Sequence, residues 1–514
     1  MSVISYLTKG TFSAFPGIAL IVIAVIVFSA LWGLRRPRGW PNGPVGLPFI
    51  GSAFELVRNP HLTMAKYAKK YGPIYSMKIG TRRVVVLNTM DMVKEALVDK
   101  ANDFAGRMQT QSFDIISEGR NDIVFGEFSK FWQFRRKLGA KTIRKYASGP
   151  ELERLFQKEA LPRLLKAIEE KNEEPFQLKT LIMLTIVNIV GAMCFGKQYD
   201  LEDQEFQEIV KVTKNTLDNF GNGLMGDVMP ILRHVPTPSV VMARRGVLKW
   251  LGIIQKHVDD HMDKFQNDNT NTQDLIDELL KSRTDEATIS SGKAYRLDST
   301  NLRQITSNLF GAGLHTTIAT LNWCFAFMIT HPDVKEKVRR EVDEVIGQDR
   351  LPALTDRKNM PYCNAVINET LRIRSIAIII PRCTTCDTAV GGFLLKKGTW
   401  VFCNTWKIHM DETVWSKPEE FRPERFLDKH GQLLHKPDNF IPFGMGRRMC
   451  LGETLAMNEM FLYLVSLIQR YSFSTPPDGT KPRMQELCEA FIIQCRPYKI
   501  VARRRRPLPN NESH

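Results

Sequence analysis

The chain has 514 residues, of which 43% are hydrophobic and 25% charged, so it can bury a large core and is not intrinsically disordered by composition. Lysine and arginine number 71 against 55 acidic residues, a formal net charge of +16. This balance favours acidic partners such as anionic lipid or an acidic protein surface. No basic module is interleaved with aromatic residues, so nucleic acid is not predicted as a partner.

Residues 1–34 are predicted to form a membrane anchor. Residues 11–34 carry no charge, and 24 helical residues at about 1.5 Å each would cross a hydrocarbon core of roughly 30 Å. A cleaved signal peptide is the alternative. Only Lys9 precedes the apolar run, whereas three arginines follow it within four residues, which favours a retained single-pass anchor with a cytosolic C-terminal side.

Proline and glycine dominate the next segment, 35–51, which is predicted to be a basic hinge because proline cannot continue a helix. Two β-rich runs, 74–79 and 83–87, flank Gly80-Thr81 and predict a hairpin. From about 90 to 375, apolar residues at three- and four-residue spacing predict helices.

The pattern becomes strand-like from 388 to 408, and no internal repeat or long linker divides the body. We therefore expect one mainly α domain over 52–502 with small peripheral sheets, followed by a basic polar tail at 503–514.

Nine cysteines are scattered along the chain, and this odd, unclustered set argues for a reducing compartment and against a disulfide framework. Cys383 and Cys386 have CxxC spacing, but no second pair completes a zinc site, so both are interpreted as structural. Cys450 differs because glycines permit tight turns around it and the apolar segment 453–467 predicts a helix directly after it. Amides at a helix N-terminus favour a thiolate, which is an axial ligand for haem iron.

The window around Cys450 resembles the signature F-x-x-G-x-R-x-C-x-G of the cytochrome P450 family. The five fixed positions are Phe443, Gly446, Arg448, Cys450 and Gly452. The resemblance extends over about 40 to 500 and implies the cytochrome P450 fold, a haem b cofactor and Cys450 as the thiolate ligand of the iron.

Two further motifs carry charge in the family's order. Glu369 and Arg372 match E-x-x-R, and the resemblance implies a buried structural cluster with Arg425 beneath the haem. Trp132 and Arg136 match W-x-x-x-R.

By the same resemblance, haem propionates would contact Trp132, Arg136, Arg382 and Arg448. Solvent-facing arginines are the alternative for any one of them.

The third motif is Phe310-Gly-Ala-Gly-Leu-His-Thr-Thr317. By the resemblance, Ala312 and Gly313 would leave room for dioxygen, and Thr316 would hydrogen-bond and guide protons during oxygen activation. A threonine bonded back to the preceding turn is the alternative. His315 stands where the family commonly has an acid; it could relay protons, alter their delivery, or be a core histidine.

The apolar segment 376–380 would line the substrate pocket by family analogy, although an interior strand would look the same. The substrate contacts predicted from this are Phe310, Ile376 and Ile380.

The chain resembles the microsomal animal branch of steroid and xenobiotic hydroxylases. This implies an endoplasmic reticulum enzyme that inserts one oxygen atom from O2 into an apolar substrate, with electrons from NADPH through cytochrome P450 reductase or cytochrome b5. The reductase would dock near Arg135, Lys137, Lys141 and Arg447. A haem-thiolate isomerase or dehydratase, suggested by His315, and a non-catalytic membrane haem binder are the alternatives.

Overall fold

The structure is a computed structural model. It describes residues 36–505 except 58, 148, 221–222, 268–273, 285–287, 290–292, 295–296 and 490–491, together with Ala24 and Val27. Apart from those two residues, the predicted anchor at 1–34 lies outside the described residues, as does 506–514 of the predicted tail.

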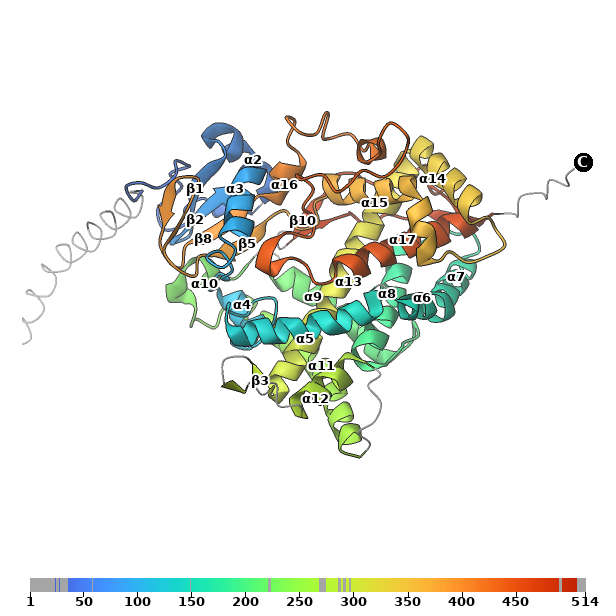
Figure 1. Cartoon of the computed structure of the whole chain (residues 1–514), viewed down its shortest axis with the longest axis horizontal. Coiled ribbons are helices and arrows are strands. Elements are labelled where there is room, and N and C mark those ends of the chain that lie inside the picture. The colour runs from blue at the N-terminus through green and yellow to red at the C-terminus, as the bar shows by residue number, and fades with distance from the viewer. Residues whose placement is uncertain are drawn as a thin grey trace, which may run out of the picture.

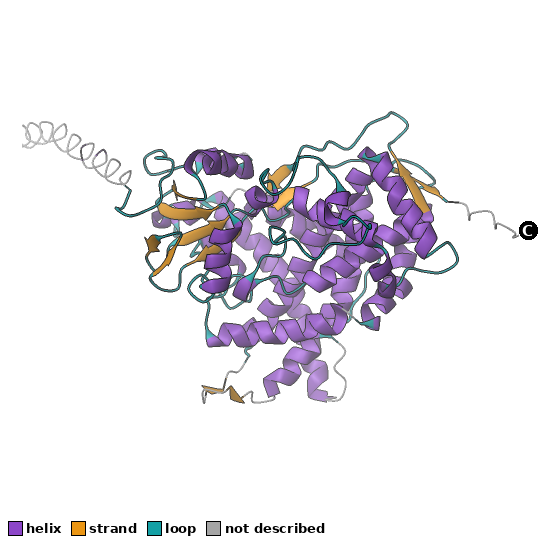
Figure 2. Cartoon of the chain, turned by 45° about the horizontal axis from the view of Figure 1, so that its top comes forward, coloured by secondary structure: helices purple, strands orange, loops and turns teal. Residues whose placement is uncertain are grey.

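Helices form most of the body, and the four-stranded sheet lies at one end of it (Figures 1 and 2). The α-helices are α2 Pro60–Tyr71, α3 Met90–Lys94, α4 Gln111–Ile116, α5 Lys130–Ala147, α6 Pro150–Leu155, α7 Leu161–Glu169, α8 Leu178–Phe195, α9 Gln204–Phe220, α10 Met225–Val228, α11 Pro238–Asn267, α12 Leu275–Thr284, α13 Ser299–Thr330, α14 Pro332–Val345, α15 Pro361–Ile373, α16 Thr405–His409 and α17 Glu453–Arg470. The predicted mainly α architecture is confirmed.

The core is built around α13 and α8, which pack against each other and are apolar on nearly all sides. Both are long and apolar enough to cross a membrane, yet 78% of the most apolar window of each is buried inside the protein. A helix that is hydrophobic all round is a core helix when other elements cover it, and α15 and α17 complete that cover.

The main sheet has the order β1-β2-β8-β5, with β2 and β8 parallel and the other pairs antiparallel. The predicted hairpin is confirmed, since β1 and β2 pair around Gly80-Thr81. The strands are β1 Ile74–Ile79, β2 Arg82–Leu87, β3 Thr288–Ile289, β4 Lys293–Ala294, β5 Ile380–Cys383, β6 Thr388–Val390, β7 Phe393–Leu395, β8 Trp400–Cys403, β9 Tyr471–Ser474, β10 Leu487–Glu489, β11 Ile492–Gln494 and β12 Val501–Arg504.

Both ends of the described body are more ordered than the sequence suggests. The Pro/Gly hinge lies along β1, where Ser76 N–H donates to Asn42 O at 2.8 Å and Ser52 N–H donates to Lys78 O at 2.6 Å. The tail prediction is wrong at its start, because β12 continues through Arg504 and pairs with β9. Arg505 then forms an ion pair with Asp343 at 2.5 Å.

Candidate functional site

The loop before α17 holds Cys450 in a fixed place. Gly444 and Gly446 have φ of +70° and +73°, which other residues adopt at a cost, and a Cβ on Gly446 would lie 1.9 Å from Leu97 O. Cys450 N–H closes the loop by donating to Phe443 O at 2.9 Å. The helix then begins at Glu453, as predicted, with Gly452 as its N-cap.

The Cys450 side chain is accessible, although the surrounding protein raises the pKa of its thiol. The Gly452 N–H and the Arg136 guanidinium oppose this shift and stabilise the thiolate, but burial outweighs them. A coordinated metal deprotonates a thiol directly, so this cysteine suits a metal ligand.

Arg448 and Trp132 form a stacked pair beside the cysteine loop. The Arg448 guanidinium lies 4.1 Å from the Trp132 ring centroid and donates to Gly126 O at 2.6 Å. Trp132 is buried; its indole N–H donates to Ile123 O at 2.8 Å and its ring packs on the Arg448 guanidinium. The predicted contact of Trp132 with a haem propionate stays a prediction.

Four guanidiniums gather at this site, one of which the sequence reasoning missed. They belong to Arg107, Arg136, Arg382 and Arg448. Burial lowers the pKa of Arg382 to about 10 and that of Arg448 to about 9, and repulsion from the neighbouring arginines adds to both shifts. Arg107, whose pKa is also lowered, donates to Val124 O at 2.8 Å and to Pro381 O at 2.7 Å.

Two carboxylates act on Arg448, those of Asp122 and Glu127, and Asp122 has the larger effect. Asp122 is fully buried, accepts hydrogen bonds from Phe125 N–H, and has its pKa raised by burial. Among the described residues, none of the four guanidiniums forms an ion pair with a carboxylate, so the site carries excess positive charge. A ligand with two carboxylates would neutralise it, and haem b has two propionates. The donor set, with an accessible thiol beside it, fits haem b.

Glu369, Arg372 and Arg425 form the second cluster expected from the sequence, and the structure brings all three together. Arg372 binds Glu369 through both carboxylate oxygens at 2.7 and 2.8 Å, and Arg425 Nε donates to Glu369 at 2.9 Å. The Glu369 and Arg372 side chains have no exposed surface. This geometry suits a structural role.

Hydrogen bonds connect that cluster to the cysteine loop. Arg372 donates to His409 O at 2.7 Å, and His409 Nε2 accepts from Ile441 N–H at 2.9 Å, nine residues before Cys450. His409 Nδ1 lies 2.6 Å from Ser375 Oγ. Burial lowers the pKa of His409 to about 3, so the ring stays neutral and can accept from Ile441.

On α13, Ala312 and Thr316 share one accessible face, one turn apart. Thr316 Oγ1 donates to Ala312 O at 3.0 Å, which fixes its hydroxyl and leaves the oxygen as an acceptor. A Cβ on Gly313 would meet Val190 of α8 at 3.2 Å, so this glycine also permits close helix packing. The space for dioxygen predicted at Ala312 and Gly313 stays a prediction.

Two titratable groups adjoin the Thr316-Thr317 pair. His315 directly precedes it on α13, and Glu459 of α17 contacts Thr317. Burial lowers the pKa of His315 to about 4, and Lys179 of α8 lowers it further, so the imidazole is neutral near pH 7. Sequence reasoning missed Glu459 of α17. It is fully buried, takes a hydrogen bond from Thr317, and has its pKa raised to about 8 by burial.

The three predicted substrate contacts differ in position. Phe310 has no exposed surface, and its ring packs against Phe195 and Trp250 with centroids 5.0 and 5.4 Å apart. Its contact with a substrate stays a prediction. Ile376 is also buried. Ile380 is half-buried, and its Cδ1 lies 3.4 Å from a Cβ built on Gly444, which places it beside the cysteine loop.

Comparisons with known proteins find relatives that match nearly the whole chain. The family model Cytochrome P450 matches residues 41–502. Cytochrome P450 1A1 of Rattus norvegicus is 33% identical over 94% of this chain and 97% of its own length. Steroid 17-alpha-hydroxylase/17,20 lyase of Ictalurus punctatus is 34% identical over 95% of this chain and 96% of its own.

A solved zebra fish cytochrome P450 with progesterone has a TM-score of 0.77 at 29% identity, covering 86% of this chain and 99% of that one. The same protein with abiraterone has a TM-score of 0.74. The chain belongs to the cytochrome P450 family, whose members bind haem b and act as monooxygenases.

Proposed function

We propose that this protein is a haem-thiolate monooxygenase that inserts one oxygen atom from O2 into an apolar, steroid- or xenobiotic-like substrate. The observation that carries the proposal is the accessible Cys450 in a rigid loop beside four guanidiniums that form no ion pair with a described carboxylate. When bound through a thiolate, haem b supplies the redox chemistry that activates dioxygen.

The chain's own residues would hold and orient that group. Cys450 is the proposed iron ligand, and Arg107, Arg136, Arg382 and Arg448 are the proposed partners of its carboxylates. Ala312 has a small side chain and so leaves space on the accessible face of α13. The Thr316 hydroxyl is fixed by its bond to Ala312 O, and its oxygen can accept a hydrogen bond from a bound group. His315 precedes Thr316 on α13 and is neutral near pH 7, because burial lowers its pKa to about 4, so its imidazole can donate one hydrogen bond and accept another.

The substrate class is inferred from the relatives and from the segment after α15. The relatives named above include a steroid hydroxylase and cytochrome P450 1A1, and one solved structure holds progesterone. Titrating the purified holoprotein with progesterone and with planar aromatic compounds, while following the iron spin state, tests this assignment. If neither class of compound shifts the iron spin state, the assigned substrate class is wrong.

We propose that an NADPH-dependent reductase docks on α5, with cytochrome b5 as a second donor. The exposed face of this helix carries Lys137, Lys141 and Arg144, and Arg447 is exposed on the cysteine loop. Such a basic face suits an acidic partner. Arg135 is corrected here: it is 4% exposed, and its guanidinium lies 4.7 Å from the Phe131 ring centroid, so it is not part of the docking face.

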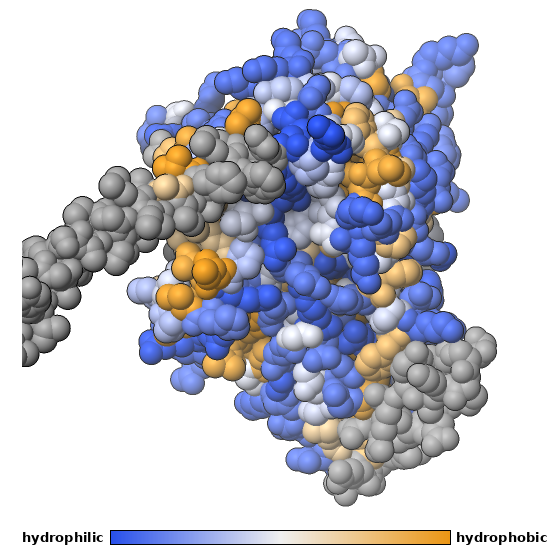
Figure 3. All heavy atoms as spheres, turned by 90° about the vertical axis from the view of Figure 1, so that its left-hand side faces the viewer, coloured by the Kyte–Doolittle hydropathy of each residue, from blue (hydrophilic) through white to orange (hydrophobic). Residues whose placement is uncertain are grey.

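The endoplasmic reticulum membrane is the proposed location, with residues 1–34 as the anchor. The described body supports this with an exposed apolar face beside the sheet (Figure 3). Gly80 N–H donates to Ile50 O and Thr81 N–H to Val228 O, so two apolar segments meet there. We propose that the exposed apolar residues of these segments face the membrane; they are Val45, Leu47, Phe49, Ile50, Phe54, Val57, Met225, Ile231 and Val235.

Reconstitution with NADPH, cytochrome P450 reductase and a spin-shifting substrate tests the whole proposal. We expect NADPH-dependent product that carries one labelled atom from ¹⁸O2. Product formed from an organic peroxide with no need for NADPH would instead favour an isomerase or dehydratase. Intact haem with no turnover would favour a haem binder.

A further inference from the structure

One polar side chain connects the accessible face of α13 to the arginines beside the cysteine loop. Asn308 lies one turn before Ala312 and two turns before Thr316, so the three residues share a face of the helix. Ala312 and Thr316 are exposed, whereas Asn308 is 8% exposed. The hydrogen bonds of Asn308 identify the segment that covers it as 122–126.

Asn308 fixes three consecutive residues of this segment. Its Oδ1 accepts from Ile123 N–H and from Val124 N–H, each at 2.9 Å. Its side-chain amide also donates to the carboxylate of Asp122. Removing this side chain would therefore take the acceptor from two backbone donors at once.

The carbonyl groups of the same segment accept hydrogen bonds from the arginine side of the site. Ile123 O accepts from the Trp132 indole at 2.8 Å, and the Arg448 guanidinium packs on the Trp132 ring. Val124 O accepts from Arg107 Nε at 2.8 Å. The segment thus donates to α13 and accepts from the arginines and the ring that supports one of them.

The peptide between Ile123 and Val124 joins these two sides directly. A trans peptide such as this one is planar, with its C=O and N–H pointing in opposite directions. Its N–H meets Asn308 and its oxygen meets Trp132, so losing the first bond frees the peptide to rotate away from the second. Hydrogen bonds at the two ends of one peptide also polarise and strengthen each other.

We propose that Asn308 is a positioning residue for haem b, which acts through the Ile123–Val124 peptide and Trp132 on Arg448. We base this on the carboxylate-binding role proposed above for the arginines. Asn308 keeps the Arg448 guanidinium oriented before haem binds, so that binding does not have to order it. In this arrangement one helix presents Ala312 and Thr316 and also sets the donors for the haem carboxylates.

The test compares the purified holoproteins of the wild type and Asn308→Ala. Haem transfer to an acceptor protein should be about tenfold faster from the variant, because the Arg448 contact with haem is less well ordered. The propionate bending bands of the resonance Raman spectrum should shift, which a general loss of stability does not cause. Hydrogen exchange of the Ile123 and Val124 amides should accelerate in the same samples.

A conservative variant tests whether the acceptor oxygen is the feature that matters. Asn308→Asp keeps an oxygen for both amides, and two adjacent carboxyls share one proton, so the pair can keep its bond to Asp122. This variant should retain the slow exchange of both amides and most of the haem affinity. It also provides a measurable holoprotein if Asn308→Ala accumulates without haem.

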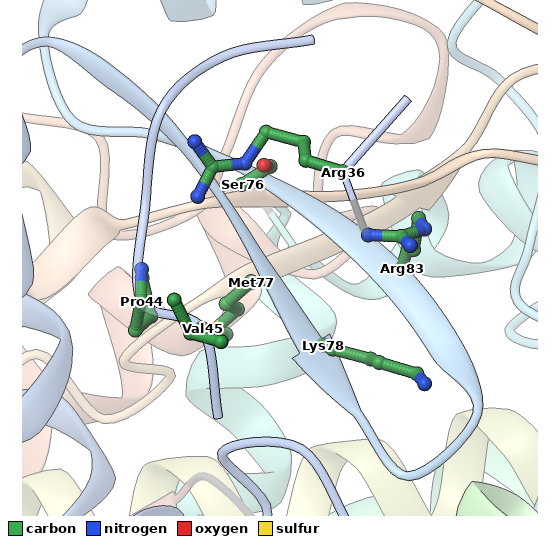
Figure 4. Close-up of a pocket in the computed structure, with 7 residues that line it drawn as sticks. All are labelled: Arg36, Pro44, Val45, Ser76, Met77, Lys78 and Arg83. Carbon is green, nitrogen blue, oxygen red and sulfur yellow. The ribbon is translucent and has the colours of Figure 1, made fainter. Parts of the chain in front are cut away.

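Two controls remove side chains that hold other loops. Asn188 of α8 is 1% exposed and donates to Tyr199 O at 2.8 Å, so Asn188→Ala is the matched change. Ser76 of β1 lies beside Arg36 where the hinge crosses the hairpin (Figure 4), and its Oγ donates to Pro41 O at 2.7 Å. Asn188→Ala and Ser76→Ala should each change haem release by less than about twofold and leave the propionate bands in place.

A double variant tests the route through Trp132. Trp132→Phe keeps an aromatic ring for Arg448 but removes the indole N–H that Ile123 O accepts. If Asn308 acts through Trp132, Asn308→Ala should accelerate haem release by a smaller factor in the Trp132→Phe background than in the wild type. Equal factors in the two backgrounds would overturn this route.

The remaining outcomes separate this role from that of the arginines. If Arg448→Gln releases haem at the wild-type rate, Arg448 does not hold a haem carboxylate and both proposals fail. If Arg448→Gln releases haem faster while Asn308→Ala leaves haem release, propionate bands and amide exchange unchanged, the positioning role of Asn308 alone is wrong.

Discussion

Two groups of buried and partly buried arginines are linked by hydrogen bonds to the cysteine loop, and they differ in which groups neutralise their charge. Arg372 and Arg425 contact the carboxylate of Glu369 directly. Arg107, Arg136, Arg382 and Arg448 gather near Asp122 and repel one another. The first group is complete within the chain, whereas the second requires an anion from outside. Charge balance thus separates scaffold arginines from ligand-binding ones.

The comparison has an energetic consequence. Removing the partner of a complete cluster leaves buried charge without compensation, which destabilises the fold itself. Removing one member of the incomplete cluster relieves repulsion in the free protein and weakens only the bound state. Substitutions in the first group should therefore destabilise the haem-free and the haem-bound protein alike, whereas substitutions in the second should weaken haem binding without destabilising the haem-free protein.

The largest effect should follow Cys450→Ser, because it removes the proposed iron ligand while the loop around it stays intact. We expect the reduced, CO-bound protein to lose the red-shifted Soret band of thiolate ligation, and NADPH-dependent turnover to vanish. Cys386→Ser changes an exposed cysteine and is the matched control. Unchanged spectra and turnover in Cys450→Ser would contradict the site.

Glu369→Gln should give the next largest effect. It leaves Arg372 and Arg425 buried without a carboxylate and should cost about 3–5 kcal/mol of unfolding free energy, with or without haem. Denaturant unfolding measures this. Glu336→Gln removes a surface pair with Arg339 and should change stability by less than about 1 kcal/mol. A loss of the same size in both variants would mean that the cluster is not structural.

Arg382→Gln tests the incomplete cluster. The haem-free protein should keep or gain stability, because the guanidinium is repelled by Arg136 and, among the described residues, donates to the adjacent Pro381 O alone. Haem should dissociate about 10–100 times more readily, as expected for one lost charge-assisted hydrogen bond. Haem transfer to an acceptor protein measures this. A loss of stability in the haem-free form, like that expected for Arg425→Gln, would place Arg382 with the scaffold.

The sequence predicted what depends on local pattern. The hairpin at Gly80-Thr81, the helix after Cys450 and the mainly α body follow from turn residues and apolar spacing. Motif spacing also named Glu369, Arg372 and Arg425, because i and i+3 residues share a helix face and the family supplies the third member.

What the sequence could not supply depends on contacts between distant segments. Arg107 stands in a loop with no motif, and only folding brings it beside Arg382. The motif does not reveal that Val190 of α8 lies where a side chain on Gly313 would point. The indole N–H of Trp132 donates to Ile123 O, a partner that the motif spacing does not reveal. Tertiary packing decides each case.

Glu459 extends the comparison to a buried carboxylate that has no arginine. The described residues give it a hydrogen bond from Thr317 and no ion pair, and burial raises its pKa to about 8. Because the unfolded chain releases this proton near pH 4.5 while the folded protein keeps it, the unfolding free energy should fall by about 1.4 kcal/mol per pH unit between these values.

Glu459→Gln should abolish this part of the pH dependence, since an amide mimics the protonated acid and can still bond Thr317. The unfolding free energy of the variant should match that of the wild type near pH 5 and exceed it near pH 8. At pH 8 the unfolded wild-type chain has already released the Glu459 proton, which favours unfolding. Unfolding midpoints measured across this range provide the test, with Glu336→Gln as a control that keeps the wild-type slope. Parallel curves for the wild type and Glu459→Gln would show that this carboxylate ionises normally, and that burial without a cation does not set its charge.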